Sequence, residues 1–558
     1  MNPSRNPWPS FLAVSIVAAL AAFLRVVIAG DELLWLDELH TSWVVGEGLG
    51  SVAGRAADGN QAPFYFWLTW FPVSILGASE LWLRLTSVLA GVALLPAVSI
   101  LVWRWTRSNI AAVVVAVLVA TDIQFVYYAT EARPYAWVQL LGALQVGCFW
   151  RFIAKSFPSM AGRESGADTE ATTDVSGRRY MPHWGLVVSS VVLFSTHYTS
   201  VWLFVVELIF MPLVWFAFAR EAGKSSRKTF LARSLSTAVV FSVASVPMMW
   251  QMFKVFQRRG NWVGVSSIEQ TAAEQLIPFA TWILFPLMCL VIGFLWCYKL
   301  PEKDRQPVND DSAESENGWA VSSKAAFVFV SLWAVVPILC VMAMDHFGVA
   351  PMALSRYTLV GAAAFPVFAG LVIGVSKSMV VRLLIASCVL TVTAMSNPLV
   401  QHFVSYGELA NLRAEDWKSV VDEIGLRDSK KNQPLFLFAN LIEDVDAFEN
   451  KDQQFQEYLL FPVQGLYSVD SSQRDLFACP TMPTTHFLDE QISKAKERGG
   501  AWVVVRAEPQ LVQEVADEFQ SRCKNLLGDD QPVISVMDST QSAASSLQNP
   551  VYLLSIDW

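Results

Sequence analysis

Two adjacent carboxylates, Asp37 and Glu38, follow directly on an apolar stretch near the start of the sequence. A carboxylate can take the proton of a reacting hydroxyl group. Three arginines, Arg84, Arg133 and Arg356, lie at the ends of other apolar stretches, and guanidinium groups stabilise the negative charge of a phosphate. These residues could therefore serve a reaction in which a hydroxyl group loses its proton and a phosphate leaves.

Each of these candidates also has a purely structural interpretation. Asp37 and Glu38 could form the solvated start of a helix after a membrane anchor, and His197 could be a buried imidazole with its hydrogen bonds satisfied. Arg84 is different, because a guanidinium group three residues inside an apolar stretch is costly to bury and tends to have a partner or a role. The elements that position these side chains must therefore be considered.

The composition is that of a membrane protein. Hydrophobic residues make up 54% of the 558 residues and charged residues only 16%, which is more apolar than a soluble domain. The net charge of -9 is concentrated in residues 400–558, which we therefore expect to face water. The sequence has no basic face of the kind that neutralises nucleic-acid phosphates, so we exclude nucleic-acid binding.

The cysteines show no metal-cluster spacing. Five of the seven lie in apolar runs, where they suit ordinary packing. The other two, Cys479 and Cys523, could form a disulfide if residues 400–558 lie in an oxidising compartment, or could remain two thiols.

About eleven stretches have the ~20 apolar residues that a helix needs to cross a bilayer. The predicted spans are Phe11–Gly30, Leu81–Trp103, Asn109–Tyr128, Pro134–Ala154, Trp184–Ser200, Val201–Ala219, Phe230–Phe253, Leu276–Tyr298, Ala325–Met344, Tyr357–Val375 and Met379–Leu399. The first is too long for a cleaved signal peptide and is predicted to remain as an anchor. A further apolar run, Pro63–Ala78, is short and interrupted by Pro72, so we expect a helix lying in the membrane interface.

The distribution of lysine and arginine predicts the orientation. If the N-terminus is cytoplasmic and Pro63–Ala78 does not span, the inner loops hold most of the basic residues of the membrane part, as the positive-inside rule requires. An odd number of spans then places residues 400–558 outside the cytoplasm. In that region short strand-type runs such as Ala501–Val505 alternate with helical patterns such as Gln510–Phe519, which predicts a small α/β domain.

The same orientation places four polar segments on the outer side of the membrane. They are Trp35–His40, Ala129–Tyr135, Ser195–Tyr198 and Leu354–Tyr357. Because all four emerge on one face, we expect their charged side chains to form a single site at the membrane surface.

Seven short motifs in this order give the sequence a resemblance to a known family. They are Trp35-Leu36-Asp37-Glu38, Ala62-Pro63-Phe64-Tyr65-Phe66-Trp67-Leu68, Leu83-Arg84-Leu85-Thr86-Ser87, Glu131-Ala132-Arg133-Pro134-Tyr135, Thr196-His197-Tyr198, Ser355-Arg356-Tyr357 and Glu415-Asp416-Trp417-Lys418. Together they resemble the GT-C superfamily of glycosyltransferases, specifically the bacterial branch related to protein O-mannosyltransferases and to the aminoarabinose transferases that modify lipid A. The resemblance covers roughly residues 1–430. One departure is Gln61-Ala62-Pro63, where the family commonly has His-Pro-Pro; Asp58 is a nearby carboxylate that could assist.

The resemblance implies an inverting transferase that uses a polyprenyl-phosphate sugar. Residues 1–399 would form the transmembrane catalytic domain, with a first outer loop at residues 31–80, and residues 400–558 a soluble extracytoplasmic domain. Asp37 would be the general base or the group that orients the acceptor, with Glu38 beside it in the catalytic site. Binding of the donor phosphate and substrate is implied for Arg84, Glu131, Arg133, His197, Arg356 and Tyr357. Relatives differ in their use of metal, so a divalent cation is possible and its ligands are left unknown.

The expected partners are a polyprenyl-phosphate-linked sugar, membrane lipid, and a glycan or protein acceptor, at a bacterial inner membrane. Two other classes stay open. A transporter or flippase would line a path through the membrane with buried charges, whereas the charges here lie mostly at the outer rim. A non-catalytic relative would use its outer domain only to bind glycans or a partner. The C-terminal region could bind the acceptor, cover the active cleft or simply stabilise the membrane part.

Overall fold

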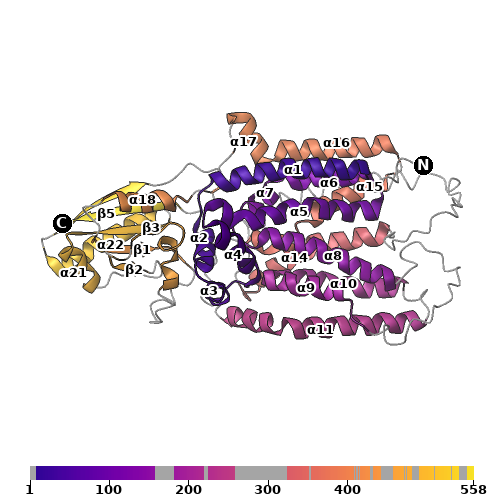
Figure 1. The fold of residues 1–558 in the computed structure, drawn as a ribbon, viewed down its shortest axis with the longest axis horizontal. Coiled ribbons are helices and arrows are strands. Elements are labelled where there is room, and N and C mark those ends of the chain that lie inside the picture. Colours follow the sequence, from indigo (N-terminus) through magenta and orange to yellow (C-terminus); the bar gives the residue numbers. More distant parts are fainter. Residues whose placement is uncertain are drawn as a thin grey trace.

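The computed structural model describes residues 8–156, 181–218, 224–257, 323–350, 354–376, 378–407, 409, 412–413, 415–427, 432–441, 457–470, 472, 474–479, 489–507, 509–528, 531–538 and 550–558. These residues form a bundle of long helices that is joined at one end to a mixed α/β region (Figure 1). Three shorter helices, formed within residues 36–76, lie between the two parts.

Eight helical segments of the described residues are long and apolar enough to cross a membrane, or nine if one bent pair counts as a span. They are α1 (Trp8–Asp31), α5 (Glu80–Thr106), α8 (Tyr135–Ser156), α10 (Val201–Phe218), α11 (Lys224–Gln257), α14 (Ser323–His346), η8 (Ser355–Gly361) with α15 (Ala364–Val375), and α16 (Met379–Ser396). The bent pair is α6 (Asn109–Thr121) and α7 (Ile123–Ala129). The prediction of a polytopic helical membrane protein is thus confirmed.

The number of spans differs from the predicted eleven for two reasons. The stretch Trp184–Ser200 forms α9 (Trp184–Thr196), which has only 13 residues, and a helix of that length is shorter than the bilayer core requires. The predicted span Leu276–Tyr298 lies outside the described residues. The short α17 (Pro398–Tyr406) then follows the last described span.

The pair α6 and α7 is bent by 62°, and side chains supply hydrogen-bond partners to backbone groups on both sides of the break. Asp122 caps α7, because its Oδ1 accepts hydrogen bonds from the amides of Gln124 and Phe125 at 3.0 and 3.3 Å. Arg25 of α1 donates to the carbonyl oxygens of Val119 and Ala120 at 2.9 and 3.2 Å. Both helix ends at the break therefore have polar partners, and α7 leads the chain to the turn that holds Glu131 and Arg133.

The three intermediate helices are α2 (Leu36–Val45), α3 (Val52–Asp58) and α4 (Phe64–Leu76). Helix α4 is the short apolar helix expected in the interface. Its Tyr65 hydroxyl lies 3.2 Å from Ser87 Oγ, and Thr69 and Thr86 are joined at 3.0 Å. These contacts hold α4 against α5.

The C-terminal region contains a five-stranded sheet with the order β2-β1-β3-β5-β4. The strands are β1 (Leu435–Phe438), β2 (Leu476–Ala478), β3 (Gly500–Arg506), β4 (Val533–Asp538) and β5 (Val551–Asp557). Strand β1 is parallel to β2 and β3, while β5 is antiparallel to β3 and β4. The helices are α18 (Trp417–Leu426), α21 (Asp489–Glu497) and α22 (Pro509–Leu527), with a 3-10 turn, η10, at Phe461–Val463. The predicted α/β architecture is confirmed.

The two faces of this sheet pack against different partners. Side chains on one face, such as Leu437 and Trp502, share a hydrophobic core with Leu39 and Trp43 of α2 and with Tyr65 of α4. The opposite face packs on α21 and α22, and Cys479 and Cys523 both lie buried there without forming a disulfide. The face of the sheet that carries Leu437 and Trp502 therefore shares one hydrophobic core with the helices that follow the first span, and in this core α2 contacts η10.

Candidate active site

The carboxylate of Asp37 lies in the first turn of α2 and keeps a quarter of its side chain exposed. Arg356 Nη1 donates to Asp37 Oδ2 at 2.9 Å, and Arg133 Nη2 lies 3.7 Å from the same oxygen. Arg356 comes from η8 and Arg133 from the turn before α8, so three segments that are far apart in sequence meet here. The positive end of the α2 dipole adds to the attraction for a negative charge.

These charges keep Asp37 ionised. Burial raises the pKa of Asp37, but the positive charges of Arg133, Arg356 and Arg506 outweigh the burial and hold that pKa below its usual value. The site therefore presents a carboxylate rather than a carboxylic acid over most of the accessible pH range.

Arg133 is oriented from two sides. Its Nη1 donates to the backbone oxygen of Asp37 at 3.2 Å and lies 3.3 Å from His40 Nδ1. Because a guanidinium group can only donate, His40 Nδ1 must be the acceptor and the ring proton sits on Nε2. Burial first, and then the charge of Arg133, lowers the pKa of His40 to about 3, so the ring is neutral.

The His40 ring is enclosed. Four aromatic rings surround it at centroid distances of 5.4 to 6.1 Å: Trp43, Phe66, Tyr458 and Phe461. Gly59 closes the remaining side, since a Cβ atom there would overlap His40 Nε2. The contact from His40 to Arg133 is thus fixed by packing that involves the C-terminal region.

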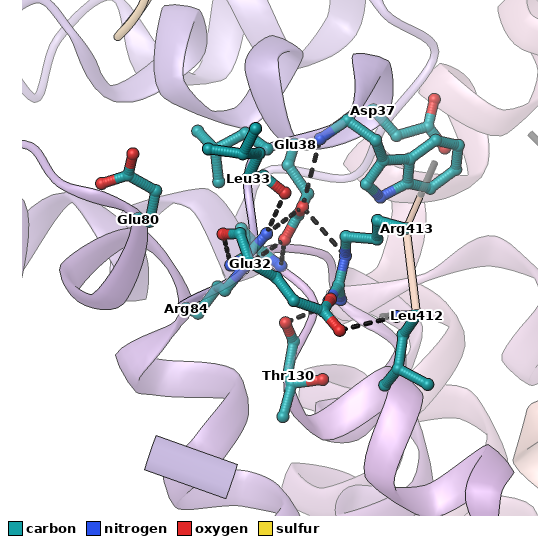
Figure 2. A network of polar contacts seen from close by, with 12 residues as sticks. Glu32, Leu33, Asp37, Glu38, Glu80, Arg84, Thr130, Leu412 and Arg413 are labelled. Atoms are coloured by element: carbon teal, nitrogen blue, oxygen red, sulfur yellow. Dashed lines mark hydrogen bonds and ion pairs between the residues drawn. The ribbon is translucent and has the colours of Figure 1, made fainter. Parts of the chain in front are cut away.

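Glu38 is completely buried, although it is the neighbour of Asp37 (Figure 2). Arg84 donates to both of its carboxylate oxygens, from Nε and Nη2, at 2.6 Å each. The amide of Ala132 donates to Oε1 at 2.7 Å, and Arg413 Nε lies 3.2 Å from Oε2. Every side of the carboxylate is occupied, so this geometry does not give Glu38 the direct catalytic place that the sequence predicted.

Arg84 likewise differs from the expectation of a donor-phosphate contact. Its side chain is fully buried, and the donors that do not bind Glu38 bind backbone oxygens. Nη1 donates to Ala29 and Glu32 at 3.0 and 2.6 Å, and Nη2 donates to Leu33 at 2.9 Å. With its donors committed to protein, Arg84 joins the end of α1 to α2 and leaves no group for a phosphate.

Arg413 completes this buried network. It was not among the site residues predicted from the sequence. It forms an ion pair with Glu32 and donates from Nη2 to the backbone oxygen of Thr130 at 2.7 Å, as Figure 2 shows. Its side chain is 1% exposed. Its position two residues before the motif that begins at Glu415 could have suggested a role in the site. Nothing in the sequence indicates that its side chain contacts Glu38.

Glu131 lies beside both groups of charges and is almost fully buried. Burial raises its pKa to about 8; the nearby charge of Arg413 opposes this shift, and those of Glu38 and Asp37 add to it. Its Oε2 has no hydrogen-bond partner among the described residues. Glu131 is therefore a neutral carboxylic acid at neutral pH, placed at the site but not cancelling its positive charge.

His197 and Tyr357 line the other side of the cluster. The His197 ring lies 5.6 Å from Tyr135 and 6.3 Å from Tyr357, measured between centroids. Its Nδ1 is 2.8 Å from Thr199 Oγ1. Burial, followed by the charges of Arg133 and Arg356, lowers the pKa of His197 to about 3, so a neutral imidazole faces the two arginines.

The described residues around Asp37 do not fit a divalent cation. No group of three or more His, Cys, Asp or Glu side chains in the described part of the chain is arranged to hold a metal ion. Asp37 and Glu38 are paired with arginines, and Glu131 is protonated near neutral pH. A carboxylate that is neutralised in these ways is a poor ligand for a hard cation.

The described residues define a polytopic α-helical membrane protein with a mixed five-stranded α/β region. Comparison with solved structures finds similarity over most of the chain to two other proteins. ArnT from Cupriavidus metallidurans in the apo state has a TM-score of 0.42 and 13% identity, over 97% of each chain. The same protein bound to undecaprenyl phosphate has a TM-score of 0.31, again with 13% identity over 97% of each chain. The oligosaccharyltransferase of Archaeoglobus fulgidus, in a complex with zinc and sulfate, has a TM-score of 0.42 and 12% identity, over 92% of this chain and 70% of that one. Comparison with protein-family models and with curated proteins finds no match.

Proposed function

We propose that this protein is a membrane glycosyltransferase that moves a sugar, with inversion, from a polyprenyl phosphate to the hydroxyl group of an extracytoplasmic acceptor. The acceptor is a glycan lipid, a cell-wall polymer or a protein. One observation carries the proposal: a partly exposed, ionised carboxylate, Asp37, is held between Arg356 and Arg133 at the end of the helical bundle where the α/β region sits.

The charge balance of this cluster suits the donor. Two guanidinium groups face one carboxylate, and Glu131 is neutral near pH 7, so the cluster retains one positive charge. The phosphodiester that links a sugar to a polyprenol carries one negative charge. The two charges therefore match, and a site of this kind binds the donor without burying a surplus charge.

Arg356 has the donors needed for such a contact. Only its Nη1 is bonded to Asp37, and its buried Nε has no partner among the described residues. Arg133 likewise has a buried Nε without a partner in the described part. Buried polar groups without partners are uncommon and call for a ligand or water, and phosphate oxygens fit both arginines.

In the reaction Asp37 accepts the proton of the acceptor hydroxyl group, whose oxygen then bonds to the anomeric carbon. The bond between that carbon and the phosphate oxygen breaks on the opposite face of the sugar. The electron pair passes to the phosphate, which leaves as polyprenyl phosphate stabilised by Arg356. When the phosphate binds Arg356, it competes with Asp37 for the guanidinium group, which makes Asp37 a better base.

The remaining assignments form part of the same proposal. Residues 1–399 would make up the catalytic membrane domain and residues 400–558 the extracytoplasmic domain, with the N-terminus in the cytoplasm of a bacterial inner membrane. His197 and Tyr357 would line the sugar or phosphate subsite. Glu38 and Arg84 would support α2 from beneath rather than touch substrate.

The proposal is tested with purified wild-type protein and a panel of polyprenyl-phosphate sugars, beginning with undecaprenyl-phosphate donors, in the presence of membrane extract as the source of acceptor. We expect release of polyprenyl phosphate and a mass increase of one sugar on the acceptor. Asp37→Asn is the matched control, because it keeps the side-chain shape and removes the base. Movement of an intact donor across vesicles without cleavage would indicate a flippase and contradict the proposal, as would equal turnover by the Asn variant.

A further inference from the structure

The first turn of α2 carries Asp37, so the position of Asp37 depends on how that turn is held. A helix begins with four backbone amides that have no partner inside the helix. Trp35, immediately before α2, has no side-chain oxygen with which to cap them. The Glu38 carboxylate approaches the Trp35 amide at 3.4 Å, which leaves the amide of Leu36 to be satisfied from elsewhere.

The partner of Leu36 comes from the C-terminal region. Glu415 Oε2 accepts the hydrogen bond of the Leu36 amide at 2.9 Å, across 379 positions of sequence. A carboxylate at a helix N-terminus satisfies an orphan amide and is also favoured by the helix dipole. Leu36 is the residue directly before Asp37, so this hydrogen bond fixes the backbone to which Asp37 is attached.

Glu415 is itself fixed by two further contacts. Trp417 Nε1 donates to Oε2 at 2.8 Å, and Arg506, the last residue of β3, donates from Nε to Oε1 at 2.7 Å. The Glu415 side chain is fully buried and that of Arg506 is 12% exposed. One carboxylate thus joins α2 to the carboxyl end of β3, and it holds the Arg506 guanidinium beside the Asp37 site.

Neighbouring contacts from the same region converge on the start of α2 and the residues before it. The Tyr467 hydroxyl accepts from the Leu34 amide at 3.1 Å and donates to Glu80 at 3.0 Å. Arg413 binds Glu38 and Glu32 on the opposite side. The segment that carries Asp37 is therefore held on several sides by residues that follow all of the described spans in sequence.

We propose that Glu415 is a positioning residue for the transfer reaction: by capping α2 from the C-terminal region, it sets the distance of Asp37 from Arg356 and Arg133. The C-terminal region then influences the reaction through the position of Asp37, beyond stabilising the protein or binding the acceptor. Two experiments test this inference. The kinetic experiment rests on the proposed function, whereas the structural experiment is independent of it.

The test compares two adjacent carboxylates in the same segment. Asp416 Oδ1 caps α18 by accepting from the Ser419 amide at 2.9 Å, so Asp416→Ala removes a helix cap of the same kind that does not touch α2. Glu415→Ala removes the cap of α2, and Glu415→Gln keeps an oxygen that can accept from Leu36. All three variants are made in the full-length chain and compared with wild type.

The structural experiment is hydrogen exchange of the peptide covering residues 34–40. We expect faster exchange in Glu415→Ala than in wild type, and wild-type exchange in Asp416→Ala. Since no turnover is involved, this experiment gives an answer even if no donor proves to be a substrate. If wild-type protein transfers no sugar, the proposed function fails, whereas equal exchange in Glu415→Ala and wild type overturns the cap itself.

The kinetic experiment measures kcat and KM separately, and the rate as a function of pH. We expect kcat of Glu415→Ala to fall by roughly 10- to 100-fold, because a displacement of about 1 Å in a reacting group can cost this much, while KM for the donor stays within about twofold. Asp37 would move away from its arginines, so the acidic limb of the rate profile shifts to higher pH. The Gln variant should recover most of the rate. A loss of folded protein alone would lower the rate equally at every pH, and that result, or an equal loss in Asp416→Ala, overturns the positioning role.

Discussion

The substitutions Asp37→Asn and Glu38→Gln make the same chemical change at adjacent positions and should have opposite consequences. Asp37 lies in the accessible cluster with Arg356 and Arg133, whereas Glu38 is closed in by Arg84, Arg413 and the amide of Ala132. We expect Asp37→Asn to lower turnover by orders of magnitude and to keep the fold. We expect Glu38→Gln to weaken the fold and leave turnover in the protein that remains folded.

The magnitudes follow from exposure and partners. Asp37 and Arg356 each keep 25% of the side chain exposed, and a pair that water reaches contributes only about 0–1 kcal/mol to stability. Loss of a general base lowers the rate by roughly 10²- to 10⁴-fold. Glu38 and Arg84 are both fully buried, and removing one partner of a buried pair costs about 3–5 kcal/mol.

The assay measures both quantities on the same preparations. Thermal unfolding in detergent gives the stability of each variant, and release of polyprenyl phosphate per folded molecule gives turnover. A Glu38→Gln protein that unfolds like wild type but is inactive, together with an Asp37→Asn protein that remains active, would show that the roles of the two carboxylates are reversed.

Three other substitutions test separate parts of the site. Replacing Arg356 by Gln removes a positive charge that lowers the pKa of Asp37. In wild type we expect the acidic limb of the kcat/KM profile to lie below the usual aspartate pKa of about 3.9. In the variant a pH–rate measurement should find this limb at higher pH. Glu131→Gln should abolish a pH effect on stability. The pKa of this group rises from 4.5 to about 8 on folding, so the folded wild type keeps a proton that the unfolded chain releases, and the contribution of Glu131 to stability falls as pH rises from 4.5 to 8. Other groups also titrate in this range, so the measurement is the difference in thermal stability between wild type and variant, and wild type should lose stability relative to the variant from the lower to the higher pH. Gly59→Ala should displace the ring of His40 and destabilise the protein by about 1–3 kcal/mol, which a thermal-unfolding measurement would detect; an unchanged midpoint would argue against tight packing around His40.

Much of the architecture was predictable because it depends on local patterns. Long apolar runs gave α1, α5 and α14 close to their observed bounds, and the strand-type run Ala501–Val505 lies within β3. Strand β2 was not predicted. It has only three residues, too few to show an alternating pattern, and its pairing with β1 is decided by tertiary contacts.

The different environments of Asp37 and Glu38 could not be read from the sequence. Successive side chains on an α-helix are turned by about 100°, so neighbours in one motif face different surroundings. For α2 this rotation directs Asp37 toward Arg356 and Glu38 into the interior. A phosphate contact was also predicted for Arg84. Nothing in the sequence shows that Glu38 and three backbone oxygens lie within hydrogen-bond distance of its guanidinium group.

The bond from Leu36 to Glu415 joins positions 379 residues apart, and this separation has a consequence for biosynthesis. During synthesis from the N-terminus, the first loop enters its compartment long before the segment with Arg413 and Glu415 is made. Until then Glu38 lacks its contact with Arg413, and the amide of Leu36 lacks the carboxylate of Glu415. Contacts of such long range form late, so the nascent protein passes through a stage in which its spans are inserted but its reaction centre is still unassembled.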